Sequence, residues 1–201
     1  MKEGFLFKML HFLNLSLHIL KTRVWYKFFL KKSGKKNTII NPIVLTPSCI
    51  ILGDHVLIRN NGRLEGIFNY QGTKYSPEIN IGDNVTIEQN AHITCACKIH
   101  IGNNTAIAAN VTITDIDHPY LDITLPPERQ TLLVTPVQIG EDCKIYNNAV
   151  ILPGTILGKH TIVAANAVIL GREYPAFCVL AGIPAKIVKQ YDFTKNTWLV
   201  P

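Results

Sequence analysis

The 201-residue sequence lacks the cysteine pattern of a disulfide-stabilised domain or of a structural zinc site. Its five cysteines form an odd set, and Cys95 and Cys97 have a single residue between them. That spacing is too short for an ordinary zinc pair, and no second pair follows downstream. We therefore expect buried thiols in a reducing cytosol, and the sequence indicates no metal site.

The sequence is also poor in charge, and one stretch contains no acidic residue. Charged residues make up 17% of the chain, and its formal net charge is +6. The excess of positive charge is concentrated in one stretch: Lys21, Arg23, Lys27, Lys31, Lys32, Lys35 and Lys36. Because the remainder is near neutral, the basic character is local, and nucleic-acid binding is a poor explanation for it.

The N-terminal segment lacks the uninterrupted apolar run of a membrane-spanning helix and the cleavage site of a signal peptide. Its apolar residues recur at the spacing of an amphipathic helix: Leu6, Leu10, Leu13, Leu17, Leu20, Val24 and Phe28. The polar residues on the other side are His11, Asn14, His18 and Lys21. Aromatic residues interleave with the basic cluster, as in a helix lying in an anionic membrane interface. The alternative is a helix packed on the β-structure or on a neighbouring subunit, and we favour peripheral membrane contact through residues 1–36.

The feature that organises the chain is an aliphatic residue at every sixth position. It forms three runs, separated by a two-residue slip and a long insertion: Ile81, Ile87 and Ile93; Ile101, Ile107 and Ile113; Ile139, Ile145, Ile151, Leu157, Val163 and Ile169. An α-helix requires a period of 3.6 and a lone strand a period of 2. A six-residue period instead predicts a parallel β-helix, in which each hexad is one short strand plus a turn. A β-sandwich is the alternative, but its strands are not phased to a single period.

Breaks in the period predict the organisation of the chain. We expect a basic and aromatic helical segment over residues 1–36, a β-helix domain over 37–190 and a short tail over 191–201. Within the β-helix, residues 68–78 and 115–136 leave the period and should form loops. Solenoids carry function in such excursions, because the coils are filled with packing residues. The two tyrosines of the first loop could contact a polar substrate or only pack on the coils.

Three features together resemble the hexapeptide-repeat acyltransferases. They are the Ile-Gly-x-x hexads, the loop motif from Asp115 to Tyr120, and the closing motif Ala181-Gly182-Ile183-Pro184-Ala185-Lys186. Within the family, the sequence is most similar to the O-acetyltransferases of lipopolysaccharide, capsule and colanic acid assembly, relatives of the maltose and galactoside acetyltransferases. The resemblance implies an all-β fold, the left-handed parallel β-helix with three hexads per coil. It also implies a homotrimer with its active sites between neighbouring β-helices, acetyl-CoA as co-substrate and no metal.

The resemblance identifies His118 as the catalytic histidine of the extruded loop, rather than a structural one. Imidazole titrates near neutral pH, so His118 can act as the general base that deprotonates a sugar hydroxyl. Asp115 and Asp117 bracket His118, and either could orient the imidazole, bind a sugar hydroxyl or cap the loop. Tyr120 is a further candidate contact with the saccharide acceptor. Asn90 corresponds to an asparagine that contacts the acceptor in the sugar-acetylating relatives.

On the donor side, the resemblance implies that the pantetheine arm of acetyl-CoA lies in the groove between β-helices, where small residues are favoured. The residues at the matching turns are Asn147, Ala164 and Ala165. Lys186 and Lys189 are candidates for contacts with the CoA phosphates. Relatives usually carry Trp-Ile-Gly where this chain has Lys144-Ile145-Tyr146, so we expect a pantetheine wall of different shape.

The sequence therefore predicts an acetyltransferase that acts on a sugar hydroxyl of a surface polysaccharide or its lipid-linked precursor, at the inner face of the cytoplasmic membrane. One alternative is N-acetylation of a soluble amino-sugar nucleotide, which would not require the N-terminal segment. Another is a non-catalytic β-helix scaffold, which would not bind CoA. Zinc hydration chemistry is disfavoured, because four histidines do not reproduce the pattern of the related carbonic anhydrases: His92, His100, His118 and His160.

Overall fold

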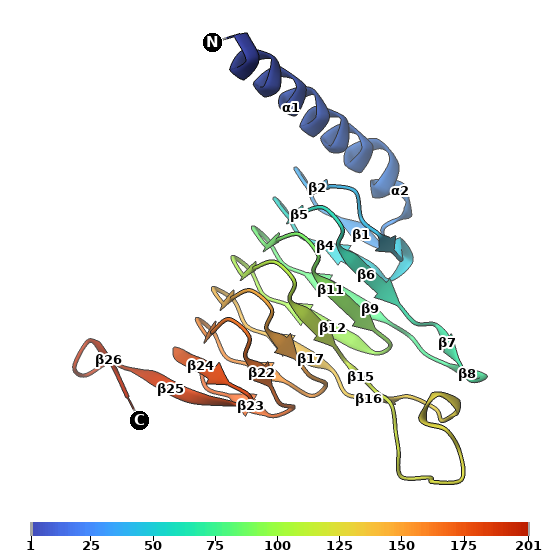
Figure 1. Cartoon of the computed structure of the whole chain (residues 1–201), viewed down its shortest axis with the longest axis vertical. Coiled ribbons are helices and arrows are strands. Elements are labelled where there is room, and N and C mark those ends of the chain that lie inside the picture. The colour runs from blue at the N-terminus through green and yellow to red at the C-terminus, as the bar shows by residue number, and fades with distance from the viewer. Residues whose placement is uncertain (1, 201) are drawn as a thin grey trace.

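The computed structural model describes residues 2–200, except for the side chains of residues 2, 3, 5, 6 and 11. The helix positions expected for the Leu6 and His11 side chains therefore lie outside the described part of the chain. From Lys32 onward, the chain winds into stacked coils of three short strands (Figure 1). Equivalent strands of successive coils pair in parallel, so the prediction of a parallel β-helix is confirmed.

Three parallel sheets form the sides of the β-helix. Sheet 1 contains β1 (Lys32–Ser33), β4 (Ile50–Leu52), β9 (Glu78–Ile81), β12 (Lys98–Ile101), β17 (Val137–Ile139), β20 (Ile156–Leu157) and β23 (Glu173–Tyr174). Sheet 2 begins with β2 (Thr38–Ile39), β5 (Leu57–Ile58), β10 (Thr86–Ile87), β13 (Ala106–Ile107), β18 (Lys144–Ile145), β21 (Ile162–Val163) and β24 (Cys178–Gly182). Sheet 3 contains β3 (Val44–Leu45), β6 (Arg63–Gly66), β11 (His92–Cys95), β14 (Thr112–Thr114), β19 (Val150–Ile151) and β22 (Val168–Ile169). A short 3-10 helix, η2 (Pro47–Cys49), precedes β4.

The core consists of columns of aliphatic side chains that stack from coil to coil within each sheet. In sheet 2, the parallel register stacks Ile58, Ile87, Ile107 and Ile145 on one another, and all four are fully buried. Burying such a side chain contributes about 1.5–3 kcal/mol of hydrophobic stabilisation. One hexad is too small to bury its own residue, so this stabilisation exists only in the stack.

The corner between sheets 2 and 3 is built from asparagines in the left-handed backbone region. Their φ angles lie between 59° and 62°, which asparagine tolerates better than most residues. Each amide except the last donates a hydrogen bond of 3.0–3.2 Å to the amide oxygen of the asparagine in the next coil. The members of this ladder are Asn61, Asn90, Asn110, Asn148 and Asn166. Asn90, expected to contact the acceptor, is thus one rung of a structural ladder.

The N-terminal segment is helical and packs on the first coils, where Tyr26 contacts the core and Thr22 forms hydrogen bonds. It comprises α1 (Lys2–Lys21), the π-helical turn η1 (Thr22–Tyr26) and α2 (Lys27–Phe29). Thr22 is buried, and its hydroxyl oxygen accepts the backbone N–H of Ile39 at 2.9 Å. The same hydroxyl donates to the carbonyl of His18 at 2.8 Å. Because β1 pairs from Lys32, the coils begin a few residues before the predicted boundary at 37.

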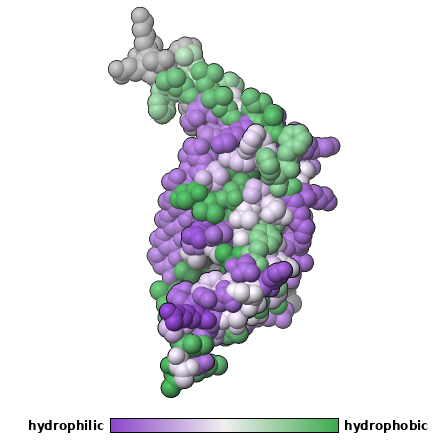
Figure 2. All heavy atoms as spheres, turned by 90° about the vertical axis from the view of Figure 1, so that its right-hand side faces the viewer, coloured by the Kyte–Doolittle hydropathy of each residue, from purple (hydrophilic) through white to green (hydrophobic). Residues whose placement is uncertain are grey.

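Helix α1 turns Asn14, Leu15, His18 and Ile19 toward the coils, and its other described apolar residues point outward. Asn14 and His18 line a cleft of about 550 Å³ between the helix and the first coils. The exposed apolar residues of α1 include Met9, Leu10, Phe12, Leu13, Leu17 and Leu20. Figure 2 shows hydrophobic side chains along this helix, which projects from a largely hydrophilic body. Among the described helices, none is long and apolar enough to cross a membrane.

The chain after β24 folds back and extends sheet 2 with two antiparallel strands. Strand β25 (Ala185–Asp192) pairs with β24, and β26 (Thr197–Leu199) pairs with β25. The segment predicted as a tail over 191–201 therefore contains the end of β25 and the whole of β26. The ring of His160, at a corner of the last coils, stacks on Phe177 at 5.5 Å and on Trp198 at 6.4 Å. The final hairpin thus packs on the last coils.

Candidate active site

All the interruptions of the six-residue period fall at one corner of the β-helix, between sheets 3 and 1. The first lies between β6 and β9 and contains the hairpin of β7 (Asn69–Tyr70) and β8 (Thr73–Lys74). The second is a tight turn between β11 and β12 that contains Ala96 and Cys97. The third lies between β14 and β17 and contains β15 (Ile116–Asp117), the 3-10 helix η3 (Pro127–Arg129) and β16 (Leu133–Val134). The hairpin and this long loop consequently extend from the same side of the molecule (Figure 1).

The hairpin is attached to the long loop by its two tyrosines. The hydroxyl of Tyr70 lies 2.8 Å from the carbonyl oxygen of Glu128 and 2.7 Å from its Oε2 atom. Gln71 donates from Nε2 to the same carbonyl at 2.8 Å, and the backbone N–H of Leu132 donates to the hydroxyl of Tyr75 at 2.9 Å. The hydrogen bond to the Glu128 carboxylate raises the pKa of Tyr70. These tyrosines therefore hold the loop, a role that the sequence did not indicate.

His118 follows β15 at the base of the long loop and is half-buried. Its ring contacts the ring of Tyr70, with centroids 5.5 Å apart and planes at 74°. The Nδ1 atom of His118 is buried and has no hydrogen-bond partner among the described residues. The loop carboxylate or backbone carbonyl expected to bind this nitrogen is therefore not in place within the described chain. Among the described residues, Tyr70 is the one whose ring packs against the ring of His118.

A pocket of about 280 Å³ opens beside His118 on the outer side of sheet 3. Its lining residues are Ile67, Tyr70, His92, Thr94, Thr112, Thr114, Ile116, His118 and Leu132. The register sets His92 beside Thr112 and Thr94 beside Thr114, so outward residues of β11 and β14 lie next to one another here. Nε2 of His92 lies 2.7 Å from the Thr94 hydroxyl, and partial burial, followed by the charge of Arg63, lowers the pKa of His92. The lining therefore offers hydroxyl groups and imidazoles, without a carboxylate, ammonium or guanidinium group.

Asp115 does not face this pocket. Its side chain is fully buried, and its two carboxylate oxygens accept the backbone N–H groups of Ala96 and Cys97, each at 2.8 Å. The thiol of Cys95 donates to the same carboxylate at 3.2 Å. Asp115 thus reaches into the tight turn of the preceding coil and satisfies its buried donors. The sugar contact expected for Asp115 is incompatible with this burial, and the capping role is the one that fits.

The remaining acceptor candidates lie outside the pocket lining. Asp117 is exposed, and Tyr120 is 72% exposed on the long loop. Asn90 lies in the amide ladder, two residues before His92. His92 was not recognised as a site residue, although it alternates with the inward Ile93 in a strand and therefore had to point outward.

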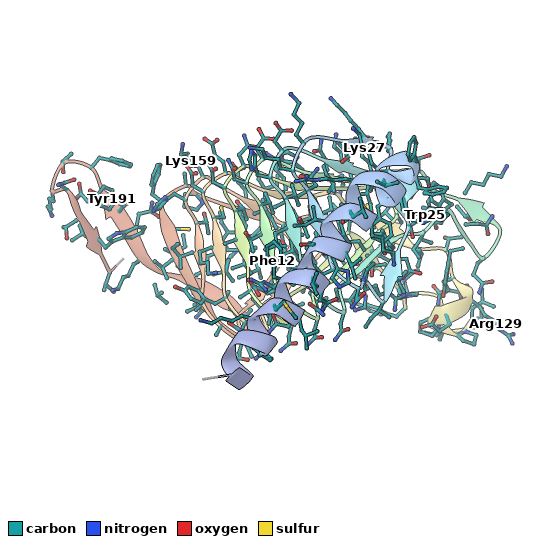
Figure 3. The ribbon with its side chains drawn as sticks, turned by 90° about the horizontal axis from the view of Figure 1, so that it is seen from above. Phe12, Trp25, Lys27, Arg129, Lys159 and Tyr191 are labelled. Carbon is teal, nitrogen blue, oxygen red and sulfur yellow. The ribbon has the colours of Figure 1, made fainter. Side chains whose placement is uncertain are left out.

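The residues expected on the donor side lie on other parts of the β-helix. Asn147, Ala164 and Ala165 occupy corners between sheets 2 and 3, and none of them lines the pocket beside His118. Lys186 and Lys189 are exposed on β25. Figure 3 shows Arg129 of the long loop and Tyr191 of the C-terminal hairpin at opposite sides of the molecule. Within one described chain, the donor-side residues and His118 are therefore not brought together.

The described residues contain no group of three or more histidine, cysteine or carboxylate side chains arranged to hold a metal ion. Four cysteines are buried, namely Cys49, Cys95, Cys143 and Cys178. Burial raises the pKa of both the Cys49 and the Cys143 thiol to about 11, which keeps these groups protonated near neutral pH.

Comparison with known proteins places these features in a family context. Residues 136–171 match the family model described as bacterial transferase hexapeptide (six repeats), and residues 79–115 match the hexapeptide repeat of succinyl-transferase. A relative in Escherichia coli K12, WbbJ, is named as an O-acetyl transfer protein of lipopolysaccharide biosynthesis. It is 31% identical over 201 residues, which cover 93% of this chain and 92% of the relative.

Solved structures share the fold, which is the left-handed β-helix that the resemblance implied. AntD, an N-acyltransferase from Bacillus cereus solved with a dideoxy amino-sugar nucleotide and coenzyme A, superimposes with a TM-score of 0.65 at 16% identity. The match covers 84% of this chain and 88% of that chain. The Vibrio cholerae acetyltransferase VCA0836, solved with acetyl coenzyme A, gives a TM-score of 0.55 at 21% identity, covering 89% and 86%.

Proposed function

This chain belongs to the hexapeptide-repeat acetyltransferases, and we propose that it transfers an acetyl group from acetyl-CoA to a sugar hydroxyl of a surface polysaccharide or its lipid-linked precursor. The relative of similar length supports this acceptor class, because its name refers to O-acetyl transfer in lipopolysaccharide biosynthesis. Acetyl coenzyme A bound to a protein of the same fold supports the donor.

The observation that carries the proposal is the chemistry of the pocket beside His118. Its lining combines threonine hydroxyls and His92 with apolar groups and the ring of Tyr70. Sugars present hydroxyl groups at their edges and C–H groups on their faces, and the two kinds of lining match these surfaces. A nucleotide sugar carries two phosphates, for which arginine or lysine is the usual partner, and this lining has neither. The pocket therefore favours a neutral sugar acceptor over an amino-sugar nucleotide.

In the proposed reaction, His118 acts as the general base. Its imidazole takes the proton of the sugar hydroxyl while the hydroxyl oxygen attacks the thioester carbon of acetyl-CoA. The tetrahedral intermediate collapses with cleavage of the carbon–sulfur bond, and the imidazolium returns the proton to the departing CoA sulfur. The products are an acetyl ester and CoA. Because Nδ1 of His118 is enclosed, we assign the proton transfer to Nε2.

Completing the site requires the donor-binding surface of a neighbouring subunit. We propose a homotrimer in which Asn147, Ala164 and Ala165 of one chain border the pantetheine arm and Lys186 and Lys189 bind the CoA phosphates. The tip of the long loop supports such a contact, because its exposed apolar residues form a surface that favours burial. These residues are Tyr120, Leu121, Ile123 and Leu125. Light scattering of the purified protein should give the mass of three chains, and a monomer that is fully active would contradict the arrangement.

We further propose that the outward face of α1 rests on an anionic membrane surface, on the cytoplasmic side where lipid-linked sugars are assembled. Deleting residues 1–36 would also remove β1 and the anchor at Thr22, so substitutions are the sharper test. The variant with Leu13, Leu17 and Leu20 changed to glutamine should sediment less with phosphatidylglycerol vesicles than wild type. Ile183→Gln, at an exposed site on the far end of the chain, is the matched control. Unchanged sedimentation of the triple variant would refute membrane contact.

The reaction itself is tested by measuring CoA release from acetyl-CoA with cell-envelope glycans as acceptors. His118→Ala should lower the acceptor-dependent rate by about a hundredfold or more. His55→Ala, at an exposed corner of the second coil, should leave the rate unchanged. The product of O-acetylation is an ester and should release acetate in mild alkali, whereas an N-acetyl product should not. A rate unaffected by His118→Ala would refute the general-base role, and failure to bind CoA would favour the scaffold alternative.

A further inference from the structure

We propose that Tyr70 is a positioning residue for His118, and that the β7–β8 hairpin is the element that sets the catalytic imidazole in place. The inference rests on the proposed function only in that it concerns the same histidine. It starts from a gap in the hydrogen bonding of His118, whose buried Nδ1 atom has no partner among the described residues. A catalytic imidazole is usually oriented through this second nitrogen. Here its orientation has to come from packing.

Tyr70 supplies that packing, because its ring lies against the imidazole with centroids 5.5 Å apart and planes at 74°. This is an edge-to-face arrangement, which is directional and therefore restricts rotation of both rings. The neighbouring residues Asp117 and Tyr120 are exposed and cannot restrict the imidazole in the same way.

Tyr70 is itself held from the opposite limb of the long loop. Its hydroxyl is within 2.8 Å of two oxygen atoms of Glu128, and Gln71 binds the same residue. The hairpin that carries Tyr70 turns through Gln71 and Gly72, with φ angles of 49° and 77°, and positive φ at both central residues makes a tight two-residue turn. The side chain of Tyr70 thus joins the limb carrying His118 to the limb carrying Glu128. Tyr70 therefore links the conformation of the long loop to the orientation of the His118 imidazole.

Two substitutions distinguish the contribution of the Tyr70 ring from that of its hydroxyl group. Tyr70→Phe keeps the ring and removes the hydrogen bonds to Glu128, whereas Tyr70→Leu removes the ring as well. Tyr75→Phe is the matched control, because it loosens the loop at Leu132 without removing the ring that contacts His118. Histidine-selective NMR reports on the ring directly: nuclear Overhauser contacts from the His118 ring protons to the other residues of the pocket give the direction of the imidazole, and they do not change merely because the Tyr70 ring current is lost. That measurement needs no substrate.

We expect Tyr70→Leu to weaken these His118 ring contacts and to lower kcat about tenfold to a hundredfold, with KM for acetyl-CoA within about twofold of wild type. Tyr70→Phe should retain the His118 ring contacts and most of kcat, while amide exchange accelerates in residues 119–131. Wild-type His118 ring contacts and kcat in Tyr70→Leu would overturn the proposal. So would an equal loss of kcat in Tyr75→Phe, because the effect would then be general loosening of the loop.

Failure of the proposed function would look different. If His118→Ala keeps the full rate of acetyl transfer, His118 is not the base, yet the nuclear Overhauser contacts of the His118 ring still decide whether Tyr70 positions it. If these contacts weaken in Tyr70→Leu but kcat does not change, His118 is positioned without consequence for catalysis, and the proposal is overturned.

Discussion

Replacing Asp115 by asparagine tests whether this carboxylate is a structural group of the corner or a group of the site. One carboxylate oxygen accepts the N–H of Ala96 and the other accepts the N–H of Cys97, both at 2.8 Å. Asparagine has the same shape but only one acceptor oxygen, so its NH₂ group must face one of these donors. A buried backbone N–H then loses its partner in a position closed to water, because Asp115 is fully buried.

The magnitude follows from those contacts. A hydrogen bond to a charged acceptor contributes about 1.5–3 kcal/mol, and a buried donor without a partner costs about 1–3 kcal/mol. The two quantities overlap, so we expect Asp115→Asn to lower the free energy of unfolding by about 2–4 kcal/mol. Urea unfolding followed by circular dichroism measures this loss. Alkylation of the native protein gives a local readout, since the thiol of Cys95 donates to the same carboxylate and should react faster in the variant.

Asp117→Asn is the matched control, because it makes the same chemical change two residues away at an exposed position. Its unfolding free energy should stay within about 0.5 kcal/mol of wild type. The reasoning is refuted if Asp115→Asn unfolds at the same urea concentration as wild type while Cys95 stays protected. Equal destabilisation by Asp117→Asn would refute it as well.

Two further predictions concern the ladder and the thiols. Asn110→Gly should destabilise the protein less than Asn110→Ala, because both lose the amide bonds to Asn90 and Asn148 but only alanine is strained at a φ of 60°; equal urea midpoints would contradict this. Iodoacetamide should modify the partly exposed Cys97 of the native protein before the buried Cys143, whose pKa burial raises to about 11; peptide mass spectrometry that finds Cys143 modified first would contradict the burial argument.

The β-helix was predictable because its signal is local and repeated. Each hexad places its aliphatic residue inward, and this placement repeats along many hexads. The prediction of the fold therefore does not depend on any single position. The placement of α1 is different. Amphipathic spacing indicates that the two sides of a helix differ, but the side that faces the coils here carries Asn14 and His18 beside Leu15 and Ile19. Which side of α1 faces the coils depends on the hydrogen bond between Thr22 and Ile39. This contact joins residues far apart in the sequence and leaves no pattern in either segment.

The candidate site was predictable in position but not in its contacts. Inward residues advance in steps of six from sheet to sheet. The steps that are too long are Leu45 to Leu52, Leu64 to Ile81, Ile93 to Ile101, and Ile113 to Ile139. Counting hexads in threes assigns all these steps to the corner between sheets 3 and 1.

Stacking then places these excursions in a row along this corner. Only the short turn at Ala96 and Cys97 lies between the hairpin that carries Tyr70 and the loop that carries His118, so the two can meet. The six-residue period does not predict which side chains of the excursions contact one another at this corner. The Tyr70 hydroxyl reaches Glu128 across 58 residues, and Asp115 turns inward although it belongs to the loop motif that resembles those of the relatives. Asp115 thus takes the capping role that the sequence left open, because the backbone of the tight turn needs its two acceptor oxygens. Asp117 and Tyr120 are exposed and make no such side-chain contacts within the described chain, so in the trimer that we propose their roles depend on the neighbouring subunit.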